Sequence, residues 1–200
     1  MIKVDLPSAP YSFSANSYIL TSGNECCIID PAVPYSQSLY FGNLKYIILT
    51  HCHFDHILEI DSWVKATGAK VLVSRYDGKG LSDPRINCYY HFFNSEKGYS
   101  GEYGTLADKD VIVIGEDKLC VMECPGHTPG SIALVAQGFA IVGDTVFAGG
   151  GYGRCDLPGG NYVLLRKSID KLMSLPEETV LYCGHGPQTT VREYKASIRF

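Results

Sequence analysis

The sequence predicts an α/β fold in which strands dominate and helices are interspersed. Short apolar runs bounded by glycine, proline and aspartate recur along the chain, a pattern typical of strands. Two longer segments instead place their apolar residues at helical spacing. With 46% hydrophobic residues in 200, the chain can bury a sizeable core, and we expect a single domain over residues 1–200.

Eight or more strands follow from these runs. In chain order the runs are NSYILTS, CCIIDP, LKYIILT, AKVLVS, DVIVI, KLCVMECPG, SIALVAQGFAIVG and TVLYCGHG. The first predicted helix covers residues 55–70 and stops at Gly68, and the second covers residues 160–176 and stops at Pro176. Residues 76–104 are too long for a plain connection, and we interpret them as a lid or a substrate wall.

Charge and composition exclude several classes of partner. The net charge is −4, and lysine and arginine are scattered without a basic stripe, so neither nucleic acid nor an anionic membrane is favoured. No apolar stretch suits a signal peptide or a membrane span, so we expect a cytoplasmic protein whose eight cysteines are reduced. A small-molecule substrate fits these limits, and the oligomeric state stays open.

The densest group of polar side chains is the stretch THCHFDH, directly after the run LKYIIL. An extended backbone points His51 and His53 to the same side and Cys52 to the other, because strand side chains alternate. Asp55 and His56 follow at the turn into the first helix, where they can aim at a neighbouring point. The spacing HxHxDH at the end of a strand therefore predicts metal ligands.

Three further apolar strands also end at a candidate ligand, namely His127, Asp144 and His185. The whole set is five histidines and two aspartates, whereas one zinc ion in a protein takes three or four ligands. The sequence therefore predicts two divalent metal ions, with Asp144 as a candidate bridge. Imidazole and carboxylate favour Zn²⁺, with iron and manganese as alternatives. The sixth histidine, His91, is interpreted as an ordinary surface residue.

The motifs THCHFDH, PGHTPGS, GDTVF and GHGPQTT, in this order, resemble the metallo-β-lactamase superfamily over nearly the whole chain. The pattern GRCDLPGGN and the helix before the last strand are similar to the short glyoxalase II-like (hydroxyacylglutathione hydrolase-like) enzymes. The resemblance implies a four-layer αββα sandwich with its metals at one edge. It also implies a metal-dependent hydrolase.

Position by position, the resemblance implies two ligand sets that share one bridging aspartate. They are His51, His53 and His127 for the first metal, Asp55, His56 and His185 for the second, and Asp144 between them. Asp30 matches an aspartate that supports the HxHxDH loop without binding metal; its place before Pro31 also suits a turn. Arg154 and Tyr152, in GGGYGRCD, are candidate substrate contacts, and an Arg154–Asp156 structural pair is the alternative for Arg154.

The predicted reaction is acyl transfer to water by a metal-bridging hydroxide, since a metal lowers the pKa of bound water to about 7. Asp55 is expected both to bind metal and to orient this hydroxide. A thioester such as an S-2-hydroxyacylglutathione suits the reaction, because its thiolate leaves readily. However, the chain ends soon after His185, and Pro187 replaces a tyrosine that contacts glutathione in the family, so we expect an incomplete glutathione site.

The alternative function is a mononuclear-iron persulfide dioxygenase, which resembles the same motifs but uses only His51, His127 and Asp144. A flavin-linked diiron reductase is disfavoured because His53 stands where its motif has glutamate. A β-lactamase is disfavoured by the missing export signal, and a tRNA-processing nuclease by the lack of a basic arm. A non-catalytic binding module would leave the open coordination positions without a purpose.

Overall fold

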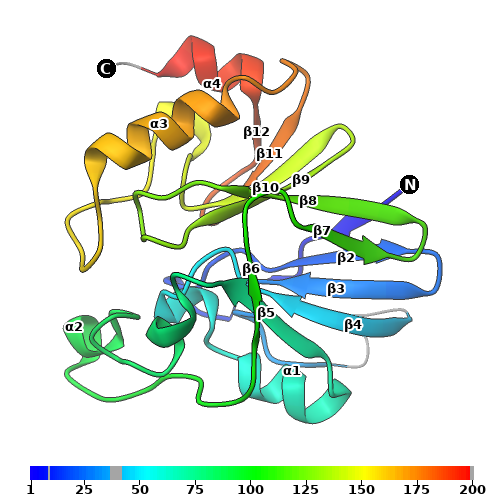
Figure 1. Cartoon of the computed structure of the whole chain (residues 1–200), viewed down its shortest axis with the longest axis vertical. Helices are drawn as coiled ribbons and strands as arrows, with labels where there is room; N and C mark the ends of the chain where they lie inside the picture. Colours follow the sequence, from blue (N-terminus) through cyan, green and yellow to red (C-terminus); the bar gives the residue numbers. More distant parts are fainter. Residues whose placement is uncertain (9, 37–41, 199–200) are drawn as a thin grey trace.

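The computed structural model contains two six-stranded sheets packed face to face, with helices on the outer face of each (Figure 1). The structure describes residues 1–8, 10–36 and 42–198, and the other positions of the predicted domain lie outside the described residues. The predicted four-layer αββα sandwich is therefore confirmed. Within the described ranges, no helix has the length and apolar character needed to cross a bilayer.

The chain builds its first sheet before its second. The strands of the first sheet are, in spatial order, β1 (Lys3–Asp5), β2 (Tyr18–Ser22), β3 (Glu25–Ile29), β4 (Asn43–Ile48), β5 (Lys70–Ser74) and β6 (Gly104–Leu106). Strands β1 to β3 pair antiparallel, and β3 to β6 pair parallel.

The second sheet follows in the chain and is antiparallel except where β10 pairs with β11. Its strands are, in spatial order, β12 (Thr189–Thr190), β11 (Val180–Cys183), β10 (Phe139–Gly143), β9 (Ile132–Ala136), β8 (Asp117–Glu123) and β7 (Val111–Ile114). All eight apolar runs contain a strand, and SIALVAQGFAIVG divides into β9 and β10 at Gly138, whose φ is +85°.

Both sheets are apolar on two faces, because neighbouring residues along a strand enter different cores. In β3, Ile28 packs in the core under the helix of the first sheet, whereas Ile29 packs between the sheets. In β9, Leu134 packs between the sheets, whereas Ala133 packs under the helices of the second sheet. This double burial explains why the runs are continuously apolar rather than alternating.

The outer helices are α1 (Ile60–Thr67) on the first sheet and α3 (Tyr162–Leu172) and α4 (Val191–Ser197) on the second (Figure 1). Gly68 ends α1 in the left-handed conformation, with φ +66°, as its position predicts. The first predicted helix, 55–70, is too long: a 3-10 turn, η2 (Phe54–His56), precedes α1. The Glu59 amide donates to the Pro31 carbonyl at 2.9 Å, outside any helical ladder.

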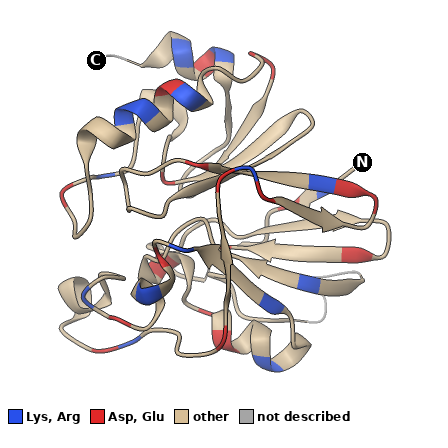
Figure 2. Cartoon of the chain, in the orientation of Figure 1, with Lys and Arg blue, Asp and Glu red and all other residues tan. Residues whose placement is uncertain are grey.

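Residues 76–104 contain more structure than the sequence indicates. They form a 3-10 turn, η3 (Gly78–Leu81), and a short helix, α2 (Tyr89–Phe93), before β6. His91 lies on α2 and is exposed. Among the described residues, lysine and arginine are dispersed over both sheets and their helices, and they form no continuous basic face in the view of Figure 2.

Candidate metal centre

Four strands end at the same edge of the two sheets and carry their ligand candidates there. His51 follows β4, His127 follows β8, Asp144 directly follows β10, and His185 follows β11. The η2 turn brings Asp55 and His56 to the same place. A side chain at Gly184 would collide with the Asp144 carboxylate and the His56 ring, so this strand end needs glycine. The structure thus gathers all seven predicted ligands: His51, His53, Asp55, His56, His127, Asp144 and His185.

Three imidazoles form the first group. His53 Nδ1 lies 2.8 Å from His127 Nε2, which lies 3.2 Å from His51 Nε2. Any two nitrogen ligands of a tetrahedral zinc, with Zn–N bonds of about 2.0 Å, lie roughly 3.3 Å from each other. All three residues are buried, and their ring nitrogens are close enough to hold one ion.

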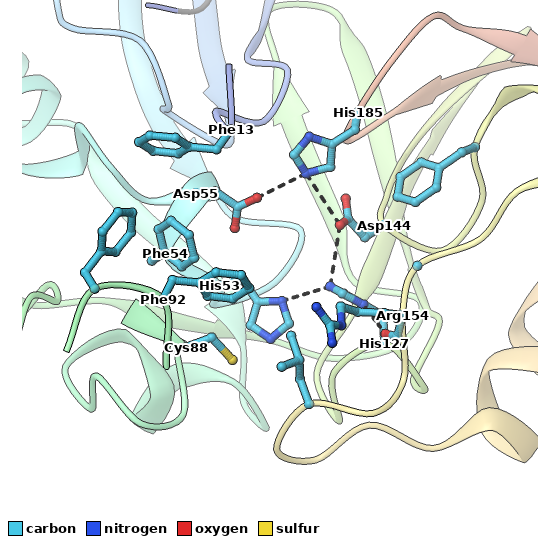
Figure 3. A pocket seen from close by; sticks show the side chains of 14 residues that line it. Phe13, His53, Phe54, Asp55, Cys88, Phe92, His127, Asp144, Arg154 and His185 are labelled. Atoms are coloured by element: carbon cyan, nitrogen blue, oxygen red, sulfur yellow. Dashed lines mark hydrogen bonds and ion pairs between the residues drawn. The ribbon is translucent and has the colours of Figure 1, made fainter. Parts of the chain in front are cut away.

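The second group combines Asp55, His56 and His185. Asp55 Oδ2 lies 3.1 Å from His185 Nε2 and 3.9 Å from His56 Nε2. Asp144 stands between the groups, and its Oδ1 is 3.2 Å from His56 Nε2. Its Oδ2 is 3.5 Å from His127 Nε2 and 3.6 Å from His185 Nε2 (Figure 3). One carboxylate therefore reaches both groups.

Hydrogen bonds on the outer side of the rings fix which nitrogens face inward. His127 Nδ1 donates to the Arg154 carbonyl at 2.7 Å. His51 Nδ1 lies 3.1 Å from Thr50 Oγ1, which itself donates to Asp30 at 2.6 Å and so must accept from the ring. These bonds turn the Nε2 atoms of His51 and His127 inward, where they lie 3.2 Å apart. Inward-facing imidazole nitrogens at this distance can share one cation.

The carboxylates around His56 also favour positive charge at the centre. Its Nδ1 contacts Asp30 Oδ2 at 2.8 Å, and its Nε2 faces Asp144. Burial lowers the pKa of His56, but the carboxylates of Asp30, Asp144 and Asp55 outweigh burial and raise it well above its ordinary value. The buried atoms His53 Nε2, His56 Nε2 and Asp144 Oδ1 have no hydrogen-bond partner among the described residues. The donor set and its charge therefore fit divalent cations.

Two other histidines stay neutral, which is the protonation state that binds metal. Burial, with help from the neighbouring rings, lowers the pKa of His51 well below its ordinary value and that of His53 to about 3. Burial opposes ionisation of Asp144, yet His56 beside it holds the pKa of this carboxyl well below its usual range. Neutral imidazoles and an ionised carboxylate thus meet at one point.

Asp30 lies behind the centre, where its carboxylate contacts His56 and Thr50, the residue before His51. Its Oδ1 accepts from the Thr50 amide at 2.7 Å, and its backbone adopts φ +50°. Cys52 is buried in the core under α1, away from the centre, and a side chain at Gly80 would collide with its sulfur. Both placements agree with the geometry expected from alternation and from the turn before Pro31.

Asp77 is a buried residue of the site that the sequence reasoning missed. Its carboxylate accepts from the Cys52 amide at 3.0 Å, the Thr128 hydroxyl at 2.7 Å and the Gly130 amide at 2.7 Å. It thereby joins the loop of His51 and His53 to the loop of His127. An aspartate just beyond the run AKVLVS was the available signal, since other site residues also follow strands.

Replacing Asp77 with alanine should lower the free energy of unfolding by about 3 kcal/mol, because three buried donors lose their acceptor. We also expect metal affinity to fall about tenfold as the two loops separate. Denaturant titration and competition with a metal chelator measure the two effects. Asp83→Ala, which removes a turn carboxylate from the same segment, is the matched control. Equal stability of the two variants would contradict this role for Asp77.

The two candidate substrate contacts lie in different surroundings. Arg154 borders a cavity of about 620 Å³ beside the metal centre. Its guanidinium forms two hydrogen bonds of 2.7 Å with the Asp156 carboxylate, so the structural pair proposed as the alternative is present. Tyr152 is not among the described residues that line this cavity; its ring lies 6.1 Å from that of Tyr162.

The sequence matches the metallo-beta-lactamase superfamily over residues 11–185. It is 33% identical to the probable metallo-hydrolase YqgX of Bacillus subtilis over 93% of this chain and 90% of the relative. It is 30% identical to the hydroxyacylglutathione hydrolase GloC of Haemophilus influenzae over 79% of this chain and 76% of the relative.

Two solved structures superpose over nearly the whole chain. The B3 metallo-beta-lactamase BLEG-1 matches with a TM-score of 0.87 and 30% identity, covering 98% of this chain and 97% of its own. TTHA1623, crystallised in a di-iron-bound form, matches with a TM-score of 0.84 and 26% identity, covering 97% of this chain and 98% of its own. These similarities agree with the sandwich.

Proposed function

The chain belongs to the metallo-beta-lactamase superfamily and is a metal-dependent hydrolase, and from that premise we propose that it uses two metal ions to hydrolyse thioesters. The observation that carries the proposal is the position of the Asp144 carboxylate, which lies 3.2 Å from His56 Nε2 in one ligand group and 3.5 Å from His127 Nε2 in the other. A carboxylate shared by two groups of ligands suits a pair of cations.

The proposed ligands divide as the geometry groups them. His51 Nε2, His53 Nδ1 and His127 Nε2 hold one ion, Asp55, His56 and His185 hold the other, and Asp144 bridges. The di-iron form of TTHA1623 supports two ions in this fold. The family match over residues 11–185 supports one domain over residues 1–200, which stays a prediction.

Two bound ions would supply an activated water at neutral pH and positive charge opposite the developing oxyanion. The chain's own residues then position the reaction. Asp55, whose carboxylate borders the cavity, accepts a hydrogen bond from the attacking water and orients it towards the scissile carbonyl. The outer bonds to Asp30 and to the Arg154 carbonyl keep the rings of His56 and His127 from turning. A thioester needs little help from a general acid, because its thiolate is a good leaving group.

Purified protein should bind close to two divalent ions per chain, because seven ligand atoms exceed what one ion accepts. Zn²⁺ is the ion we expect, with iron and manganese as alternatives. Elemental analysis after metal reconstitution measures the stoichiometry. Saturation at one iron per chain, together with sulfite production from a persulfide, would replace the proposal by a mononuclear-iron persulfide dioxygenase.

The thioester assignment is supported by relatives named as hydroxyacylglutathione hydrolases. A panel of S-2-hydroxyacylglutathione, coenzyme A thioesters, lactones and a cephalosporin tests it on the two-metal protein. The β-lactam is included because BLEG-1 is a B3 metallo-beta-lactamase. Release of thiol from at least one thioester is the expected result, and hydrolysis of the lactam or lactone alone would overturn the assignment.

A further inference from the structure

The cavity beside the metal centre has an apolar wall built from distant segments. Its floor is formed by metal-centre residues, including Asp55 and His185, and its volume is about 620 Å³. The remaining lining is dominated by large apolar side chains, which are Phe13, Phe54, Phe92, Phe93, Phe147 and Leu157. This volume can hold a whole small molecule, including groups well beyond the scissile carbonyl.

Four of the phenylalanines form a continuous cluster on one side of the centre. The ring of Phe54 lies 5.3 Å from those of Phe92 and Phe93, and Phe13 lies 5.7 Å from Phe93. Figure 3 shows Phe13, Phe54 and Phe92 on the side of Asp55 and His53, with Arg154 on the opposite side. The residues come from the loop before β2, from η2 and from α2, so three separate segments converge on one wall.

The outer rings of this wall are exposed rather than packed into a core. The exposed fractions are 54% for Phe92, 43% for Phe93 and 41% for Phe13. Covering exposed aromatic surface with an apolar group of a ligand removes that surface from water and so stabilises the bound state. The preformed hydrophobic wall therefore favours a ligand with an apolar group of matching size.

The charges around the cavity do not suit a ligand with several carboxylates. Among the described lining residues Arg154 is the one lysine or arginine, and its guanidinium is held by the Asp156 carboxylate through two 2.7 Å bonds. Helix α2, which supplies much of the wall, has the sequence YYHFF and contains no lysine or arginine. A polyanionic thiol carrier would find no free side-chain cation on this wall.

We propose that the aromatic wall binds an aryl or branched apolar group adjoining the scissile thioester and selects such substrates over small polar acyl thioesters. This proposal rests on the thioester hydrolase function proposed above. The shared chemistry is the apolar group, which can belong to the acyl part or to the thiol part of the substrate. Ring stacking and exclusion of water from the wall supply the selectivity.

The test compares three thioesters on the two-metal protein: phenylacetyl-N-acetylcysteamine, lactoyl-N-acetylcysteamine and the acetyl thioester of benzyl thiol. The native enzyme should show a kcat/KM at least about tenfold higher for a substrate with an aryl group than for the lactoyl compound. Preference for the phenylacetyl compound places the group in the acyl part, and preference for the benzyl compound places it in the thiol part.

Phe92→Ala should lower the aryl-to-lactoyl selectivity about tenfold, mainly through KM, and Phe92→Leu should have a smaller effect. Tyr90→Ala is the matched control, because Tyr90 is an exposed aromatic residue of the same helix that packs against Arg85 and does not line the cavity. The control should keep the native selectivity. Equal loss in Tyr90→Ala and Phe92→Ala would show that the helix, not the wall, is responsible, and would overturn the proposal.

A binding measurement separates this proposal from the hydrolase function. Calorimetry on the metal-loaded protein, with the benzyl thioether of N-acetylcysteamine as a probe that cannot be hydrolysed, should give weaker binding in Phe92→Ala than in Tyr90→Ala. If no thioester is cleaved, the proposed function fails, and this measurement alone decides whether the wall binds apolar groups. If thioesters are cleaved but the lactoyl compound is preferred, the wall proposal fails and the hydrolase function stands.

Discussion

Asp144→Asn is expected to lower the rate of hydrolysis about a thousandfold and metal affinity about a hundredfold. The native carboxylate lies 3.2 Å from His56 Nε2 and 3.5 Å from His127 Nε2, so it reaches both ligand groups. Asparagine keeps the shape but removes the charge, and its amide nitrogen can turn donor hydrogens towards the two ions. The bridge and the neutralising charge are lost together.

Elemental analysis and kcat/KM on the same preparation measure the two effects. Asp156→Asn is the matched control, because it also changes an aspartate next to the cavity but one whose carboxylate pairs with Arg154 instead of facing the centre. The control should retain native metal content. Native metal content in Asp144→Asn would show that the bridge is assigned to the wrong residue.

The position of the centre could be predicted from sequence because its signals are local. His51, Asp144 and His185 each follow an apolar run, and strand ends of this kind can converge at one edge of the fold. The sandwich could be inferred from the resemblance, and the continuous apolar runs agree with it, since both faces of each sheet are buried.

The features that sequence did not reveal depend on contacts between distant segments. Asp77 matters because it joins the Cys52 amide to Thr128, residues separated by a large part of the chain. The sequence suggests a lid or a substrate wall in residues 76–104, but it does not show that Phe13 meets Phe93 across the fold. The start of α1 at Ile60 follows from the 3-10 turn that points Asp55 and His56 into the centre, which helical spacing alone does not show.

Asp55 and Cys52 are close in sequence but should give opposite results when replaced. Asp55→Ala removes a carboxylate that lies 3.1 Å from His185 Nε2 and borders the cavity, so the variant should lose one ion and at least about a hundredfold in rate. Elemental analysis should then approach one ion per chain, because the group of three histidines stays intact. This partial loss of metal distinguishes Asp55→Ala from a general unfolding of the centre.

Cys52→Ala should retain native metal content and a near-native rate. The Cys52 side chain is buried in the core under α1, and burial raises the pKa of its thiol well above the ordinary value, so no thiolate is available as a nucleophile. Its backbone amide still donates to Asp77 after the substitution. We expect a loss of about 1 kcal/mol in the free energy of unfolding from the small cavity left behind. An inactive but folded and metal-loaded Cys52→Ala, beside an active Asp55→Ala, would show that the stretch HCHFDH carries a thiol nucleophile instead of a two-metal centre.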